Sequence, residues 1–170
     1  AYAEEFCTHY HPDALFHHDD WGSQISTFLS PDMFAEFYVP AYKKVYGYYK
    51  EHGVQVIVHH SDSFAATLVP YMIDMGIDIW QGVMNSNNIP ELIKMYGGQI
   101  SFMGGIESAK VDYPGWTMED VERETAKACQ ENGKLYYIPG TTIGGPMSIF
   151  PGVYQAVSEE IDKQSKICFK

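Results

Sequence analysis

The chain has 170 residues, of which 45% are hydrophobic and 15% are aromatic. These values are typical of a folded globular domain and exclude a disordered chain. The formal net charge is −11, and Arg123 is the single arginine. This argues against a nucleic-acid-binding protein, which neutralises phosphates with dense lysine and arginine.

Two further features of the composition bear on location. The sequence contains no stretch of about 18 apolar residues, so no membrane span is predicted. The three cysteines, Cys7, Cys129 and Cys168, are odd in number and far apart, and no CxxC motif occurs. Free thiols in a reducing, cytoplasmic environment are therefore expected.

Strand and helix patterns alternate along the chain. Residues 14–18 predict a strand, and Ser30 and Pro31 mark the N-cap and first position of a helix over 31–52, with a kink at Pro40. The later elements are predicted, in chain order, as a strand at 54–58, a helix at 64–75, a strand at 77–80, a helix at 89–96, a strand at 100–103, a helix at 117–133, a strand at 135–138 and a helix at 151–166.

Five such units in a row predict an α/β fold with a parallel sheet. The sheet is either open and doubly wound or part of a (β/α)₈ TIM barrel. No GxGxxG or P-loop pattern follows a strand, which disfavours a nucleotide-binding open sheet. A whole barrel needs about 250 residues. On the barrel interpretation, residues 1–170 form the C-terminal part of one domain, and about three N-terminal strands are missing.

Polar and glycine-rich segments follow the predicted strands, and function in both architectures lies at these carboxyl ends. The segments are 17–22, 59–63, 81–88, 104–107 and 139–146. Histidine and aspartate in the first two suit either a divalent metal site or a general acid–base pair. His60 and Asp62, two residues apart, would share one face if the strand continued through them. The alternative is that individual histidines turn outward and bond to a neighbouring helix.

Two other groups of side chains allow two interpretations each. Gln81 and Asn85 suit an uncharged polar substrate, but they also suit ordinary turn chemistry. Tyr42, Tyr46 and Tyr49 form one stripe on the first long helix, which favours core or partner packing.

The order of these segments resembles the uroporphyrinogen decarboxylase superfamily, which includes corrinoid-dependent methyltransferases. The matching segments are HHDDWGSQISTFLSPDMFAEFYVPAYKKV, VIVHHSDS, MGIDIWQGV, ISFMGGIES and YYIPGTTIGGPMSIFPGVYQAV. The resemblance extends from about Ala14 to the end of the chain. It implies a (β/α)₈ barrel that lacks its N-terminal third.

The departures from the family pattern bear on the chemistry. In the methyltransferase branch, a His-x-Cys pair and a later Cys hold zinc. That pair aligns here with His60 and Asp62, and the later Cys aligns with about Thr141. The resemblance therefore implies a zinc-like divalent site with harder ligands. The decarboxylase branch has a loop histidine near Thr141 and porphyrin-binding residues in the missing N-terminal part.

The expected function is a methyltransferase-like one, in which a methyl group passes from a small methylated donor to a corrinoid on a partner protein. The alternatives are decarboxylation of a tetrapyrrole and a non-catalytic binding barrel. The expected catalytic residues are His60, Asp62, Asp20 and Glu107, with His60 and Asp62 as metal ligands. The expected substrate-binding residues are His18, Asp19, Trp21, Gln81, Asn85 and Thr141.

The missing strands also predict association. An incomplete barrel would expose strand edges and an apolar inner face, expected to include Val56, Val58, Ile77 and Ile79. We therefore expect a second copy or the N-terminal part of the barrel to cover this face. Neither nucleic acid nor a membrane is an expected partner.

Overall fold

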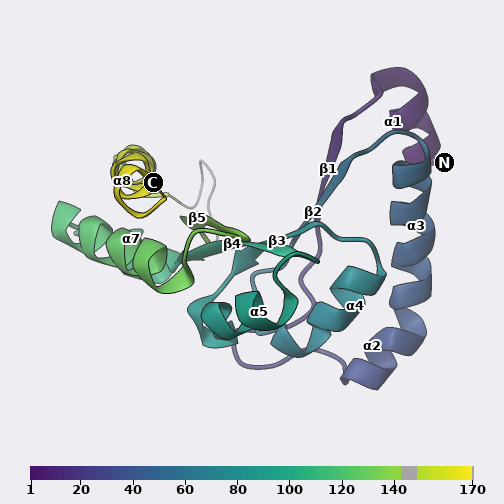
Figure 1. Ribbon diagram of the computed structural model, residues 1–170, viewed down its shortest axis with the longest axis horizontal. Helices are drawn as coiled ribbons and strands as arrows, with labels where there is room; N and C mark the ends of the chain where they lie inside the picture. Colours follow the sequence, from purple (N-terminus) through teal and green to yellow (C-terminus); the bar gives the residue numbers. More distant parts are fainter. Residues whose placement is uncertain (143–148, 170) are drawn as a thin grey trace.

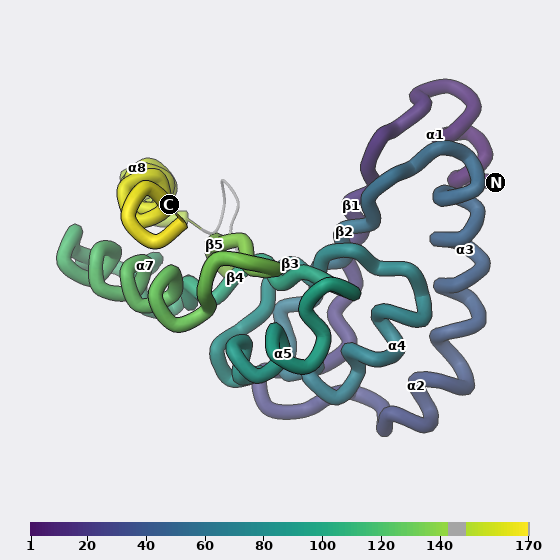
Figure 2. Tube along the Cα trace, in the orientation of Figure 1, coloured from purple at the N-terminus to yellow at the C-terminus, as the bar shows by residue number. Residues whose placement is uncertain are grey.

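The computed structural model describes residues 1–142 and 149–169, which form a curved sheet with most of the helices along one side and the last helix across its final strand (Figures 1 and 2). All neighbouring strands are parallel, and their order in space, β1-β2-β3-β4-β5, is their order in the chain. The strands are β1 (Ala14–His18), β2 (Val56–His60), β3 (Ile79–Val83), β4 (Ser101–Ile106) and β5 (Tyr137–Thr141). An open doubly wound sheet would reverse its strand order, so the structure confirms the barrel-type α/β fold.

The helices follow the strands in alternation. Their bounds are α1 (Tyr2–Tyr10), α2 (Pro31–Phe37), α3 (Val39–Glu51), α4 (Val69–Asp74), α5 (Ile89–Tyr96), α6 (Ser108–Val111), α7 (Met118–Asn132) and α8 (Val153–Cys168), with short 3₁₀ turns at η1 (Ala66–Leu68) and η2 (Asn85–Asn87). Figure 1 shows α3, α4, α5 and α7 following the convex side of the sheet. Within the described ranges, no helix is long and apolar enough to cross a bilayer.

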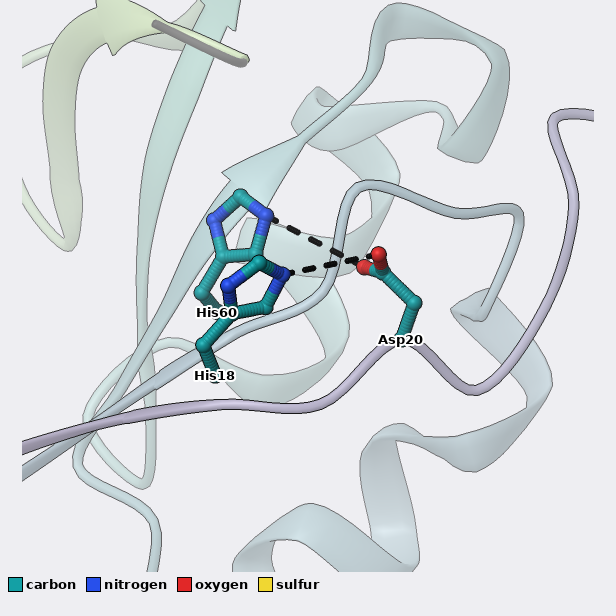
Figure 3. A group of neighbouring side chains, drawn as sticks. All are labelled: His18, Asp20 and His60. Carbon is teal, nitrogen blue, oxygen red and sulfur yellow. Dashed lines mark ion pairs between the residues drawn. The ribbon is translucent and has the colours of Figure 1, made fainter. Parts of the chain in front are cut away.

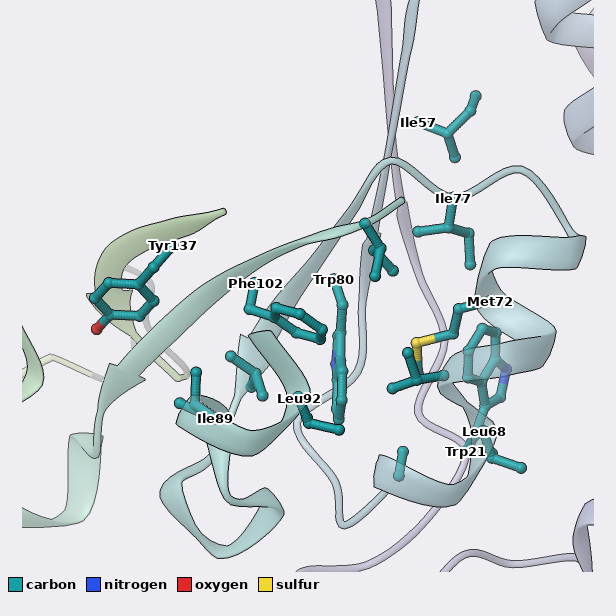
Figure 4. Packing of buried hydrophobic residues seen from close by; sticks show 14 of the residues in the cluster. Trp21, Ile57, Leu68, Met72, Ile77, Trp80, Ile89, Leu92, Phe102 and Tyr137 are labelled. Atoms are coloured by element: carbon teal, nitrogen blue, oxygen red, sulfur yellow. The ribbon is translucent and has the colours of Figure 1, made fainter. Parts of the chain in front are cut away.

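The hydrophobic core lies between the convex face of the sheet and these helices (Figure 4). Ile57, Trp80 and Phe102 point into it from three neighbouring strands and are fully buried. The opposite, open face carries Phe16 and Ile138, which are 60% and 38% exposed. Because strand side chains alternate between faces, each strand contributes both to the core and to the open face.

β1 lies where it was predicted, whereas β2 and β3 begin two residues later than predicted, and helix termination is the reason. Gly53 and Gly76 have positive φ values of 102° and 83° and end α3 and α4. The amides of Val54 and Ile77 then donate to Tyr49 and Met72, five residues back, at 3.0 Å. This is the Schellman arrangement, in which the apolar residue after the glycine packs against the helix it ends. Ile77 is therefore buried, and its predicted place on the exposed inner face was wrong.

The predicted kinked helix over 31–52 is instead two helices, α2 and α3, separated at Tyr38. Pro40 lies in the first turn of α3, where its missing amide proton breaks no intrahelical bond. The chain therefore restarts a helix instead of bending one. The amino-terminal helix α1 was not predicted, and it packs against α3.

A capping box begins α7, where the sequence predicts the start of a helix at 117. The Thr117 hydroxyl accepts from the Asp120 amide at 3.2 Å, and the Asp120 carboxylate accepts from the Thr117 amide at 3.2 Å. Replacing Thr117 with alanine should lower the free energy of unfolding by about 1 kcal/mol. Urea denaturation measures the change, with Glu131→Ala near the other end of α7 as control. Equal midpoints for the two variants would show that the cap contributes nothing.

Candidate functional site

Two histidine pairs end the neighbouring strands β1 and β2 in matched register. His17 lies beside His59, and His18 lies beside His60. Since adjacent residues of a strand point to opposite faces, one histidine of each strand faces the helices and the other faces the open side. The sheet thereby divides four histidines into a helix-side pair, His17 and His59, and an open-face pair, His18 and His60.

The open-face pair meets Asp20, which follows β1 (Figure 3). His18 Nε2 lies 3.5 Å from Asp20 Oδ2, and His60 Nε2 lies 3.9 Å from Asp20 Oδ1. One ligand atom from each residue lies within 4.8 Å of the other two. We call His18, Asp20 and His60 the rim cluster. It presents two imidazoles and one carboxylate to the open face.

Gln81 on β3 fixes the orientation of His60. The Gln81 amide nitrogen donates to the Thr141 carbonyl oxygen at 3.5 Å, so its amide oxygen faces His60 Nδ1 and accepts a hydrogen bond there. In the neutral tautomer that this bond favours, the proton is on Nδ1 and the lone pair of Nε2 faces Asp20. A second partner that fixes the tautomer in this way is typical of metal-binding histidines.

Asp62 lies beside the rim cluster but not on the strand. β2 ends at His60, so the expectation that a continuous strand aligns His60 with Asp62 was wrong. The Asp62 backbone amide donates to Asp20 Oδ1 at 2.7 Å. Its own Oδ1 is buried, with no hydrogen-bond partner among the described residues. Burial raises the pKa of this carboxyl group above its ordinary value.

The helix-side pair, His17 and His59, belongs to a different network. Tyr46 of α3 lies between the two rings, with its hydroxyl 2.6 Å from His17 Nδ1 and 2.7 Å from His59 Nδ1. His59 Nε2 donates to the Asp19 carbonyl oxygen at 3.0 Å. Burial lowers the pKa of His59 to about 4. The ring is therefore neutral at pH 7 and can donate at one nitrogen and accept at the other.

The remaining predicted site residues lie outside the rim cluster. Glu107 pairs with Lys110 at 2.7 Å, and Asn85 donates to the Gly105 carbonyl oxygen at 3.0 Å. Trp21 stacks on His59, and Asp19 accepts from Tyr42. Thr141 meets the site through its backbone carbonyl. The later part of the predicted segment 139–146, from residue 143, lies outside the described residues.

Gly82 is a site residue that the sequence did not reveal. A β-carbon there would lie 3.0 Å from the His60 ring, and its φ of 88° suits glycine. The His60 imidazole therefore packs directly on the backbone of β3. A glycine within a strand was the available signal, because such residues mark a close approach.

A hollow of about 240 Å³ is connected to the rim cluster through Gln81, which lines it. Gln81, Met103 and Thr141 form its wall on the sheet, and Tyr154, Val157 and Ile161 of α8 contribute to the other side. Its lining is mainly apolar, with Gln81 shared between the hollow and His60. The space is suited to a small, weakly polar molecule.

The rim cluster suits a divalent metal with nitrogen and oxygen ligands. Two imidazoles and a carboxylate are ligands that zinc and other first-row divalent metals accept. A thiolate zinc site does not fit, because Cys7, Cys129 and Cys168 lie on α1, α7 and α8 and contribute nothing to the cluster. The unpaired Asp62 Oδ1 is a further oxygen at the edge of the cluster.

Replacing Gln81 with leucine should weaken metal binding about 10-fold to 100-fold, the usual cost of losing an outer partner of a histidine ligand. Leucine has a similar volume but cannot accept from His60 Nδ1. Titration with Co²⁺ measures the change, and Gln81→Glu, which keeps an acceptor, is the matched variant. Equal affinities for Gln81→Leu and the parent would contradict this role.

Comparison with known proteins agrees with this fold. The sequence model of the uroporphyrinogen decarboxylase (URO-D) family matches residues 3–163. A methyltransferase from Methanosarcina mazei has a similar structure, with a TM-score of 0.66 and 20% identity. The match covers 89% of this chain and 42% of that chain, so this chain spans less than half of its length. No curated protein sequence matches the chain.

Proposed function

Because the chain belongs to the uroporphyrinogen decarboxylase family, we propose that it is part of a metal-dependent, methyltransferase-like enzyme. It would move a methyl group from a small methylated donor to a corrinoid carried by a partner protein. The observation that carries the proposal is the rim cluster, in which His18, Asp20 and His60 converge at the carboxyl ends of β1 and β2. This is the edge of a barrel-type sheet at which catalysis occurs.

Each part of the site has a distinct role in the proposal. His18, Asp20 and His60 hold a divalent metal, which supplies Lewis acidity when bound. Gln81 accepts a hydrogen bond from His60 Nδ1 and forms one wall of the apolar hollow. The hollow of about 240 Å³ takes the small donor. The open face of the sheet, with exposed Phe16 and Ile138, is the side that a partner or the rest of the barrel covers.

Decarboxylation of a tetrapyrrole fits these residues less well. A substrate with many carboxylates favours arginine, because its planar fork binds them in a bidentate manner. Arg123 already pairs with Asp120 at 2.8 Å and with Glu124 at 3.1 Å on α7. It is therefore occupied and lies on a helix remote from the rim cluster.

Two assays on the purified protein test the proposal. Titration with Co²⁺ should give one tight site with a visible absorption spectrum, and loaded protein should methylate reduced cobalamin from one of a set of methylated amines, thiols and alcohols. Absence of metal binding would favour the non-catalytic barrel. Release of CO₂ from uroporphyrinogen without methyl transfer would replace the proposal with the decarboxylase alternative.

A further inference from the structure

The helix-side histidines, His17 and His59, take no part in the rim cluster, yet both are held by side-chain hydrogen bonds. The Tyr46 hydroxyl bridges His17 and His59, and the His59 ring is fully buried. His59 uses both ring nitrogens, accepting from Tyr46 and donating to the Asp19 carbonyl oxygen. This last bond connects the buried network to the segment that contains Asp20.

Asp20 is fixed through the residues on both sides of it. On one side, Asp19 is held by His59 at its carbonyl oxygen and by the Tyr42 hydroxyl at its carboxylate. On the other side, the Trp21 ring stacks on His59, with the two centroids 3.9 Å apart and the planes within 19°. The Trp21 amide also donates to the Ser61 hydroxyl at 3.2 Å.

The contacts from α3 explain why the tyrosine stripe has its particular positions. Tyr42 and Tyr46 are one helical turn apart, so their hydroxyls reach Asp19 and His59 from the same side. Simple satisfaction of buried polar atoms would require such bonds in any core. Here, however, the Tyr42 hydroxyl contacts both neighbours of Asp20, namely Asp19 and the Trp21 indole, and Tyr46 holds His59. The Asp20 side chain between these neighbours is 42% exposed.

We propose that His59 is a positioning residue for the metal site. By holding the Asp19 carbonyl oxygen and supporting the Trp21 ring, it sets the backbone that places the Asp20 carboxylate between His18 and His60. The inference rests on the proposed metal site. It assigns the inward histidine of β2 to support and its outward neighbour to ligation.

Co²⁺ titration of substituted proteins tests this role. His59→Phe keeps a ring for Trp21 to stack on but removes both hydrogen bonds, and it should weaken Co²⁺ binding about 10-fold to 100-fold. Tyr46→Phe, nearly isosteric, should act in the same direction with a smaller effect. His59→Gln, whose amide can donate to Asp19, should recover part of the affinity. Tyr49→Phe, on the same helix and also buried, is the control and should bind as the parent does.

Two further readouts separate positioning from general loss of structure. The visible spectrum of the residual Co²⁺ complex should change in His59→Phe, because a displaced carboxylate alters the ligand geometry. Without metal, the amide-proton resonance of Asp62, which donates to Asp20 Oδ1, should shift in His59→Phe and stay in place in Tyr49→Phe. Thermal unfolding shows whether His59→Phe is folded. If it is not, the Co²⁺ affinity of Tyr46→Phe tests the positioning role instead.

The outcomes keep the two proposals distinct. If the parent binds Co²⁺ but His59→Phe and Tyr46→Phe bind it equally well, the positioning role is wrong and the metal site stands. If the parent binds no metal, the metal site is wrong, and the Asp62 resonance alone decides whether His59 places Asp20. An unchanged resonance in both variants overturns the role in either case.

Discussion

Replacing His60 with alanine is expected to weaken Co²⁺ binding by more than about 100-fold, a larger loss than that of an outer partner. His60 is the least exposed ligand of the rim cluster, with 10% of its side chain accessible against 62% for His18. It is also the ligand whose tautomer is fixed by a neighbour, Gln81. Its loss leaves Asp20 with one exposed imidazole, which cannot form a closed site.

Isothermal titration and Co²⁺ absorption measure this loss. The control is His9→Ala, because His9 is an exposed histidine with a carboxylate, Glu5, 3.2 Å away. If His9→Ala loses the Co²⁺ signal and His60→Ala keeps it, the metal binds at the surface of α1 and the rim cluster is not the site.

Replacing Trp80 with alanine is expected to lower the free energy of unfolding by about 3–5 kcal/mol. Trp80 is fully buried on β3 and packs edge-on against Phe102, with the ring centroids 6.2 Å apart. Its indole nitrogen donates to the Ser61 carbonyl oxygen at 2.9 Å. The substitution therefore leaves both a cavity and an unpaired carbonyl in the segment that follows β2.

Urea denaturation measures the effect on Trp80→Ala. Tyr2→Ala is the control, because Tyr2 is 84% exposed and its loss should change stability by less than about 0.5 kcal/mol. A change below about 1 kcal/mol for Trp80→Ala would mean that the core between β3, β4 and the helices is loosely packed.

The architecture could be predicted because local and global signals agree. Glycine stops, the capping box at Thr117 and β-branched runs each mark a boundary, and five repeats of the same order leave few topologies. The starts of β2 and β3 were predicted two residues too early. Val54 and Ile77 are apolar, and an apolar residue after a glycine fits both the end of a helix and the start of a strand. Only the hydrogen bonds from the Val54 and Ile77 amides back to Tyr49 and Met72 show that these residues belong to the helix ends.

The candidate site could be predicted in part. The sequence placed His18, Asp20 and His60 at one rim, and the structure brings these three together. It could not assign faces, because adjacent histidines differ only in which way the strand turns them. Asp62 was aligned with His60 on the assumption that β2 continues, whereas the chain leaves the sheet after His60. Glu107 was expected at the rim, but Lys110, one helical turn further on, engages its carboxylate.

The doubled histidines have a consequence for strand pairing. A one-residue slip of β1 against β2 would turn His17 outward and His18 inward. An imidazole of β1 would then still lie on the open face near Asp20, and another would still face the core. The two adjacent histidines therefore do not fix the register of β1 against β2. Protection comes from Leu15, which packs against the core while Phe16 stays exposed. A slip would exchange them, and forcing the larger ring inward costs about 1–3 kcal/mol. Leu15, two residues before His17, thus determines that His18 and not His17 lies at the rim.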